Sequence, residues 1–226
     1  MSEVMTSEAI IEAEWLLKGY WTKPRFAFQT ANGAWSDVDV LSYMPATKHL
    51  VISESKVRGE RNRIDAYTKN TKQSFAEFDK VSGKANYLSF LEHIPALCKE
   101  NVIFRDKTLT EMVESITIQL VCNYVVTSDV REKVENELKK MIPVGLPCAN
   151  FQLDSTIDVF ARVIKAEINS GQNKRYGNPV LDIAREINRY FFPSICGAGR
   201  VQGELGKQVR EEAVAEFLKA IGVGKE

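Results

Sequence analysis

Four ionisable residues interrupt two apolar, β-branched segments in the N-terminal part of the chain. Asp37 and Asp39 lie in the middle of one segment, and Glu54 and Lys56 end the next. Because side chains alternate along a strand, the two aspartates share one face, and so do the glutamate and the lysine. Aspartate is depleted in strands, so the pattern indicates a role other than folding. Carboxylate oxygens are the ligands that Mg²⁺ and Mn²⁺ prefer, and these ions also bind phosphate oxygens.

The two segments are predicted to be neighbouring strands of a β-meander. A first strand is expected over residues 26–30, and Asn32-Gly33 is a strong signal for a tight hairpin turn. The second and third strands are expected over residues 35–43 and 50–56. Pairing would bring the acidic face of the second strand beside the ionisable face of the third. We therefore expect a divalent-cation site there, with either of the two aspartates as the principal ligand.

This arrangement resembles the core of the PD-(D/E)XK nucleases, the restriction-endonuclease-like superfamily. Its members carry an acidic residue on one strand and Glu/Asp-x-Lys on the next, which Asp39 and Glu54-Ser55-Lys56 match, with Asp37 in a flanking acidic position. The resemblance implies that Asp39, Glu54 and the Ser55 carbonyl bind Mg²⁺ (or Mn²⁺). It also implies that Lys56 orients or helps deprotonate the attacking water. No proline precedes Asp39, which departs from the family's defining sequence.

The family also carries an acidic residue on the helix that precedes these strands. Residues 7–18 are predicted to form an amphipathic helix, which Ser7 would cap and Gly19 would end. By the resemblance, Glu14 completes the catalytic set, with Glu12 as the second choice. The alternative is that both glutamates belong to the solvated face of an ordinary helix.

Residues that suit nucleic-acid binding follow the third strand. Arg58, Arg61 and Arg63 come soon after Lys56, and guanidinium groups beside a phosphate-cleaving site would bind the nucleic-acid backbone. Some related nucleases carry a glutamine on the next helix, so the resemblance makes Gln73 a further candidate for nucleic-acid binding. The alternatives are a polar loop and an ordinary surface glutamine.

The composition is that of an ordinary globular protein. The 226 residues include 30 basic and 30 acidic side chains, so the formal net charge is zero. A protein that binds nucleic acid indiscriminately is usually basic, so any binding surface is expected to be local. The four cysteines are widely spaced, which argues against a zinc site and for reduced thiols. Neither a targeting segment nor a membrane-spanning run is recognised, so a cytoplasmic protein is expected.

The whole pattern predicts an α/β fold: a central mixed β-sheet flanked by helices, restriction-endonuclease-like, with a C-terminal helical extension. Buried strands are expected over residues 114–127 and 148–153, followed by helices ending near residues 141 and 168. We expect residues 1–172 to form the nuclease-like core and residues 173–226 to form the helical extension, packed on the core.

Three functions are compatible with the ionisable residues. The first is a Mg²⁺-dependent hydrolase that cleaves DNA, or alternatively RNA, as a monomer or a homodimer. The second is a catalytically inactive nuclease-like module for nucleic-acid binding or assembly. The third is a ladder of ion pairs on an exposed sheet face, but cross-strand charge pairs contribute only ~0.2–1 kcal/mol, so folding does not require them. We expect the first, a deoxyribonuclease.

Overall fold

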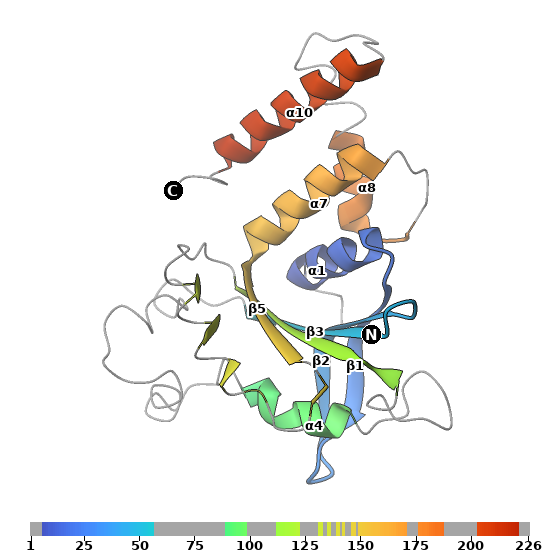
Figure 1. Cartoon of the computed structure of the whole chain (residues 1–226), viewed down its shortest axis with the longest axis vertical. Coiled ribbons are helices and arrows are strands. Elements are labelled where there is room, and N and C mark those ends of the chain that lie inside the picture. Colours follow the sequence, from blue (N-terminus) through green and yellow to red (C-terminus); the bar gives the residue numbers. More distant parts are fainter. Residues whose placement is uncertain are drawn as a thin grey trace, which may run out of the picture.

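A five-stranded mixed β-sheet forms the centre of the protein (Figure 1). The computed structural model describes residues 6–56, 89–98, 112–122, 131–132, 135–136, 139–140, 142, 146–147, 149–170, 176–187 and 203–221. The strands are β1 (Trp21–Gln29), β2 (Trp35–Met44), β3 (His49–Lys56), β4 (Ser115–Cys122) and β5 (Ala149–Ser155), and they lie side by side in this order. The first three are antiparallel, whereas β3, β4 and β5 run parallel. The prediction of an α/β protein with a mixed sheet is confirmed.

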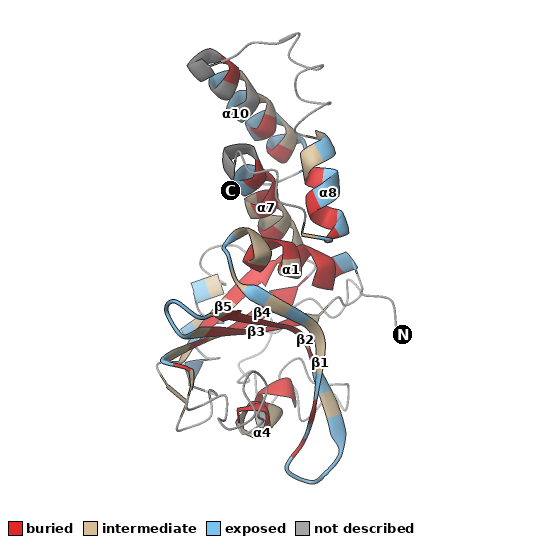
Figure 2. Cartoon of the chain, turned by 90° about the vertical axis from the view of Figure 1, so that its right-hand side faces the viewer, coloured by how far each residue is buried: buried red, intermediate tan, exposed pale blue. Residues whose placement is uncertain are grey.

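Helices lie over both faces of the sheet (Figures 1 and 2). One face is covered by α1 (Thr6–Leu17) and α7 (Thr156–Ser170); α8 (Pro179–Glu186) packs on these two helices, and α10 (Gly203–Ala220) packs on α7. The 3₁₀-helix η2 (Ser89–His93) and α4 (Ile94–Leu97) lie over the other. We refer to these as the α1 face and the α4 face of the sheet.

Each face of the sheet has its own apolar core because strand residues alternate in direction. Leu50 and Ile52 of β3 pack on the α4 face with Ile118 of β4. Val51, between them in the sequence, packs on the α1 face with Ile11 of α1. Burying each such side chain contributes roughly 1.5–3 kcal/mol. Most of the buried residues of α1 and of the central strands in Figure 2 belong to these two cores.

The hairpin predicted at Asn32-Gly33 is confirmed. Gly33 has φ 81°, a left-handed conformation that glycine adopts without steric cost. The Thr30 N–H donates to the Ala34 carbonyl over 2.8 Å and closes the turn. The turn thereby fixes the register of β1 against β2, and with it the position of Asp39.

The β1–β2 ladder is interrupted at Arg25, which has φ 50°. The residues on both sides are paired, but Arg25 and Asp39 are not paired with each other in the ladder. Val38 belongs to the core of the α4 face, whereas Val40 belongs to the core of the α1 face. Side chains two residues apart in β2 therefore point to opposite faces of the sheet on the two sides of Asp39.

The end of α1 follows the prediction. Gly19 has φ 85°, and the N–H of Tyr20 donates to the carbonyl of Trp15 over 3.0 Å. Such a left-handed residue after the last turn is a common way to end a helix. Ser7, the predicted cap, lies inside the helix, which begins at Thr6.

The predicted later elements are present in the described residues, with shifted ends. The strand expected over residues 114–127 is β4, the strand expected at 148–153 is β5, and the helix after it is α7. The helix expected near residue 141 falls largely outside the described residues. Among the described helices, none is long and apolar enough to span a membrane.

Candidate active site

The pairing of β2 with β3 extends from Met44 back to Val40 and stops one residue short of Asp39. Its last pair is Val40 with Ser53, and continuing the register by one residue places Asp39 opposite Glu54. At this point Asp39 Oδ2 accepts a hydrogen bond from the Ser55 backbone N–H over 2.6 Å. The aspartate side chain thus replaces a main-chain acceptor where the two strands separate.

Glu54 and Lys56 lie on the α4 face of β3. Their parallel register partners are Leu120 and Cys122, which belong to the core of that face. Lys56 Nζ forms an ion pair with Glu54 Oε1. The Glu54 side chain is 9% exposed, and its Oε2 has no hydrogen-bond partner among the described residues. Leaving a buried carboxylate oxygen unpaired opposes folding, so this oxygen marks a position where a ligand would be favourable.

The pKa values of the two carboxyl groups reflect this environment. Burial raises the pKa of Glu54 to about 7, the charge of Asp39 adds to the rise, and Lys56 opposes it. Burial also raises the pKa of Asp39, the Ser55 N–H opposes this rise, and the charge of Glu8 adds to it. A divalent cation beside both carboxylates would favour their ionised forms.

Asp37 lies on the same strand but has a different neighbour. Its Oδ2 is 3.8 Å from Arg25 Nη1, and its side chain is exposed. Of the two aspartates that the sequence offers as principal ligand, Asp39 is therefore the one that contacts β3.

Glu8 approaches this group from the α1 side and its charge raises the pKa of Asp39, although the sequence analysis did not select it. It lies in the first turn of α1 with a side chain 2% exposed, and Arg25 binds both carboxylate oxygens. Arg25 Nε donates to Oε2 over 3.0 Å and Nη2 donates to Oε1 over 2.6 Å. A signal was present in the spacing, because Glu8, Ile11 and Trp15 follow one stripe of the helix. We call the following residues the β2–β3 cluster: Glu8, Arg25, Asp37, Asp39, Glu54 and Lys56.

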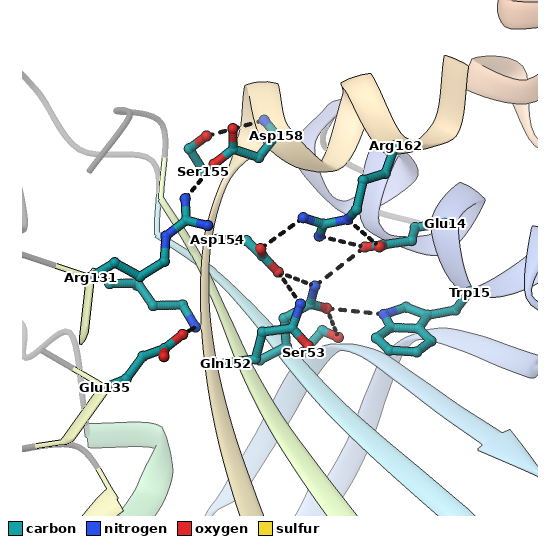
Figure 3. Close-up of polar contacts among 12 residues, drawn as sticks. Glu14, Trp15, Ser53, Arg131, Glu135, Gln152, Asp154, Ser155, Asp158 and Arg162 are labelled. Carbon is teal, nitrogen blue, oxygen red and sulfur yellow. Dashed lines mark hydrogen bonds and ion pairs between the residues drawn. The ribbon is translucent and has the colours of Figure 1, made fainter. Parts of the chain in front are cut away.

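Glu14 lies outside the β2–β3 cluster, which corrects the expectation that it sits beside the strand carboxylates. Its Oε1 accepts from Arg162 Nε over 2.6 Å and its Oε2 from Arg162 Nη2 over 3.1 Å (Figure 3). Lys18 Nζ also lies 2.9 Å from its Oε1. Glu14 is nearly two turns further along α1 than Glu8, or about 9 Å at 1.5 Å per residue. The first turn of the helix, rather than its third, therefore supplies the cluster with a carboxylate.

Glu12, the second choice, is also engaged elsewhere. Its Oε1 accepts from Thr22 Oγ1 over 3.0 Å, and its Oε2 accepts from Asn178 Nδ2 over 2.8 Å. These contacts link α1 to β1 and to the start of α8. Glu12 thus has a structural role in holding these elements together.

The contacts of Glu14 belong to a buried polar network between α1, α7 and the sheet (Figure 3). Arg162 Nη1 donates to Asp154 Oδ1 over 2.9 Å, which joins the two carboxylates through one guanidinium. Gln119 Nε2 donates to Asp154 Oδ2 over 2.8 Å, and its Oε1 accepts from Trp15 Nε1 over 3.0 Å. A network with this many paired atoms specifies how the helices pack.

The electrostatics of Glu14 agree with a structural role. Burial raises the pKa of Glu14, but the hydrogen bonds and charge of Arg162, with a smaller effect from Lys18, outweigh burial and hold this pKa below its usual value. A stably ionised, compensated carboxylate suits an ion pair better than it suits proton transfer.

The remaining predicted residues differ in how far the structure describes them. Ser55 lies between Glu54 and Lys56; its N–H holds Asp39, and its Oγ donates to Ser7 Oγ of α1 over 2.8 Å. The predicted nucleic-acid-binding residues lie outside the described residues, namely Arg58, Arg61, Arg63 and Gln73.

The carboxylates of the cluster meet the modest requirements of Mg²⁺. Within the described ranges, no three or more His, Cys, Asp and Glu side chains lie close enough to hold a metal ion by themselves. Mg²⁺, however, is usually held by one or two carboxylates and completes its shell with water and substrate phosphate. Asp39 and Glu54, whose Oε2 is unpaired within the described part of the chain, supply such a pair of carboxylates.

Comparison with known proteins identifies no family for the chain. No protein-family model matches it, and no curated protein matches it. A solved structure described as "Crystal Structure of Protein of Unknown Function AF1548" is similar at 14% sequence identity and a TM-score of 0.34, covering 96% of this chain and 97% of that one. A likeness of this degree supports no argument about fold or function.

Proposed function

We propose that the protein is a metal-dependent phosphodiesterase of the restriction-endonuclease-like type, which hydrolyses DNA at the β2–β3 cluster. The observation that supports this most is the position of Asp39 beside the buried Glu54, whose pKa is raised to about 7 and whose Oε2 is unpaired among the described residues. Besides Lys56, a further cation would relieve the cost of ionising two such neighbouring carboxyl groups. Strongly perturbed carboxyl groups beside each other are typical of functional sites.

The residues have distinct roles in this proposal. Asp39 and Glu54 would hold Mg²⁺, with the Ser55 carbonyl as a further ligand. When bound, the ion supplies Lewis-acid activation of the phosphate and a lowered pKa for a bound water. The Ser55 N–H fixes the orientation of the Asp39 carboxylate, so that it does not have to be ordered during the reaction.

Lys56 is proposed to orient the attacking water and to neutralise negative charge on the phosphate. Its ion pair with Glu54 keeps the ammonium beside the carboxylates. In the substrate complex the ammonium would donate a hydrogen bond to the attacking water or to a phosphate oxygen. It would thereby orient the nucleophile and neutralise the charge that develops on the phosphate.

Contacts to the DNA backbone are proposed for the arginines that follow β3. The chain has no net charge, so phosphate binding must come from a local group of basic residues. We assign this role to Arg58, Arg61 and Arg63, and a further contact to Gln73. Removing one arginine that binds a phosphate should reduce the slope of log K against log salt by about 1.

A cleavage assay tests the proposal. Double-stranded and single-stranded DNA are incubated with the wild type and with D39N, E54Q and K56M, in Mg²⁺ and in EDTA. We expect Mg²⁺-dependent cleavage that each variant lowers about 100-fold or more. The matched control is K48M, which removes the exposed Lys48–Glu114 ion pair and should retain wild-type activity.

Two outcomes would contradict the proposed enzymatic function. Cleavage at the wild-type rate by either D39N or K56M would show that the β2–β3 cluster is not the catalytic site. DNA binding by the wild type without cleavage in Mg²⁺ or Mn²⁺ would instead favour the inactive nucleic-acid-binding module.

A further inference from the structure

Arg25 is a cation placed among carboxylates by an unfavourable backbone conformation. Its φ of 50° lies in the left-handed region, which residues with a long side chain rarely adopt. This conformation interrupts the β1–β2 ladder opposite Asp39. The conformation is unfavourable for arginine, so it directs attention to what the side chain contacts.

The Arg25 guanidinium connects three elements of the fold. It binds both oxygens of Glu8 on α1, at 2.6 and 3.0 Å, and lies 3.8 Å from Asp37 on β2. Glu8 is almost wholly buried, so its charge needs a partner to remain in the folded protein. The hydrogen bonds with Glu8, together with the charges of Glu8, Asp37 and Asp39, raise the pKa of Arg25.

The cluster as a whole still has an excess of negative charge. It holds four carboxyl groups and two cations, Arg25 and Lys56, and the cations already contact Glu8 and Glu54. Glu54 Oε2 is nevertheless unpaired among the described residues, on a side chain that is nine-tenths buried. This oxygen is a second and separate indication that a further cation belongs in the cluster.

We propose that Arg25 is the resident counter-cation of the β2–β3 cluster, and that it competes with a divalent cation for the carboxylate of Glu8. In the metal-free protein the guanidinium compensates Glu8 and keeps it in place at the start of α1. When a divalent cation binds beside Asp39 and Glu54, Glu8, whose charge already acts on Asp39, can turn from Arg25 toward the water shell of the ion. Arg25 thereby sets how tightly the ion binds. The inference rests on the proposed function, because it requires a divalent cation in the cluster.

Calorimetric titration of the metal-free, full-length protein with Mn²⁺ tests the proposal. R25Q removes the competing charge and should bind Mn²⁺ about tenfold more tightly than the wild type. In an E8Q background there is no carboxylate to compete for, so adding R25Q should change the affinity about threefold or less. R25N serves as the second variant, because asparagine tolerates the left-handed backbone better and separates loss of charge from misfolding.

Thermal unfolding provides a readout that does not depend on activity. In EDTA, R25Q should melt below the wild type, because Glu8 loses its partner, and saturating Mn²⁺ should remove most of that difference. The matched control is R185Q, which breaks the ion pair of Arg185 with the buried Glu167 between α8 and α7. It should also lower the melting temperature but leave the Mn²⁺ affinity unchanged.

The outcomes separate this proposal from the proposed function. If E54Q abolishes Mn²⁺ binding but R25Q and R25N bind Mn²⁺ no more tightly than the wild type, the role of Arg25 is wrong. The metal site of the proposed function would still stand. Absence of Mn²⁺ binding in the wild type, R25Q and R25N would overturn the role of Arg25 together with the metal site. If R25Q raises the Mn²⁺ affinity as much in the E8Q background as in the wild type, Arg25 does not compete with the ion for Glu8.

Discussion

Replacing Glu54 with glutamine should make the metal-free protein more stable at alkaline pH while removing its response to Mg²⁺. The side chain is 9% exposed and its pKa is about 7 rather than the usual 4.5, chiefly because of burial. The folded state therefore holds the proton more tightly than the unfolded state. Stability from this group is fully present below pH 4.5 and is lost as the pH rises to about 7.

The size of the effect follows from the pKa difference. About 2.5 pKa units at about 1.4 kcal/mol each correspond to about 3 kcal/mol lost by the wild type between these pH values. Glutamine keeps the shape and does not ionise, so E54Q avoids the loss. The free energy of unfolding of E54Q, relative to that of the wild type, should therefore rise by about 3 kcal/mol between pH 4.5 and pH 8. The loss of the ion pair between Lys56 and residue 54 reduces this gain.

Urea unfolding in EDTA at pH 5, 6, 7 and 8 measures this difference. The control is E114Q, which removes a carboxylate that is 67% exposed and paired only with Lys48 in the described structure. E114Q should show no such trend. In Mg²⁺ at about 100 times Kd the wild type should gain about 2.7 kcal/mol that E54Q does not. A stability difference between E54Q and the wild type that is the same at pH 5 and pH 8 would refute the reasoning about Glu54.

Three further substitutions test the rest of the fold by urea unfolding. R162M should lose about 3 kcal/mol, because it leaves Glu14 buried without its main partner, and the loss should shrink as Glu14 protonates at low pH; a loss under about 1 kcal/mol would contradict this. K48M removes only the exposed pair with Glu114 and should leave the urea midpoint unchanged within error; a clearly lowered midpoint would show that this exposed pair stabilises the fold. N178A removes the buried cap of α8 and should cost about 1–2 kcal/mol, and an unchanged midpoint would show that the cap is dispensable.

The elements that could be predicted from the sequence are those that local rules determine. The turn at Asn32-Gly33 depends on one glycine with a positive φ, and the end of α1 depends on Gly19. The turn and the alternation of β2 and β3 were sufficient to place Asp39 beside the strand that carries Glu54. The mixed sheet followed from short, buried strands that alternate with helices.

What could not be predicted depends on tertiary placement. The sequence analysis selects Glu14, with Glu12 second, whereas Glu8 is the glutamate whose charge acts on Asp39; tertiary packing decides which turn of α1 lies near the middle of β2. The partner of Glu14 is Arg162, which is 148 residues away, so no local pattern reveals it. Arg25 gives no local sign of its left-handed backbone, because arginine is not a residue type that favours it.

Crystals soaked in Mn²⁺ and measured at the manganese absorption edge test the central claim most directly. The anomalous difference map should show one peak between the Asp39 and Glu54 carboxylates, with oxygen ligands about 2.0–2.3 Å from the ion. The peak should be missing in crystals of E54Q. A well-ordered map with no peak at these two side chains, or a peak that survives in E54Q, would contradict the account.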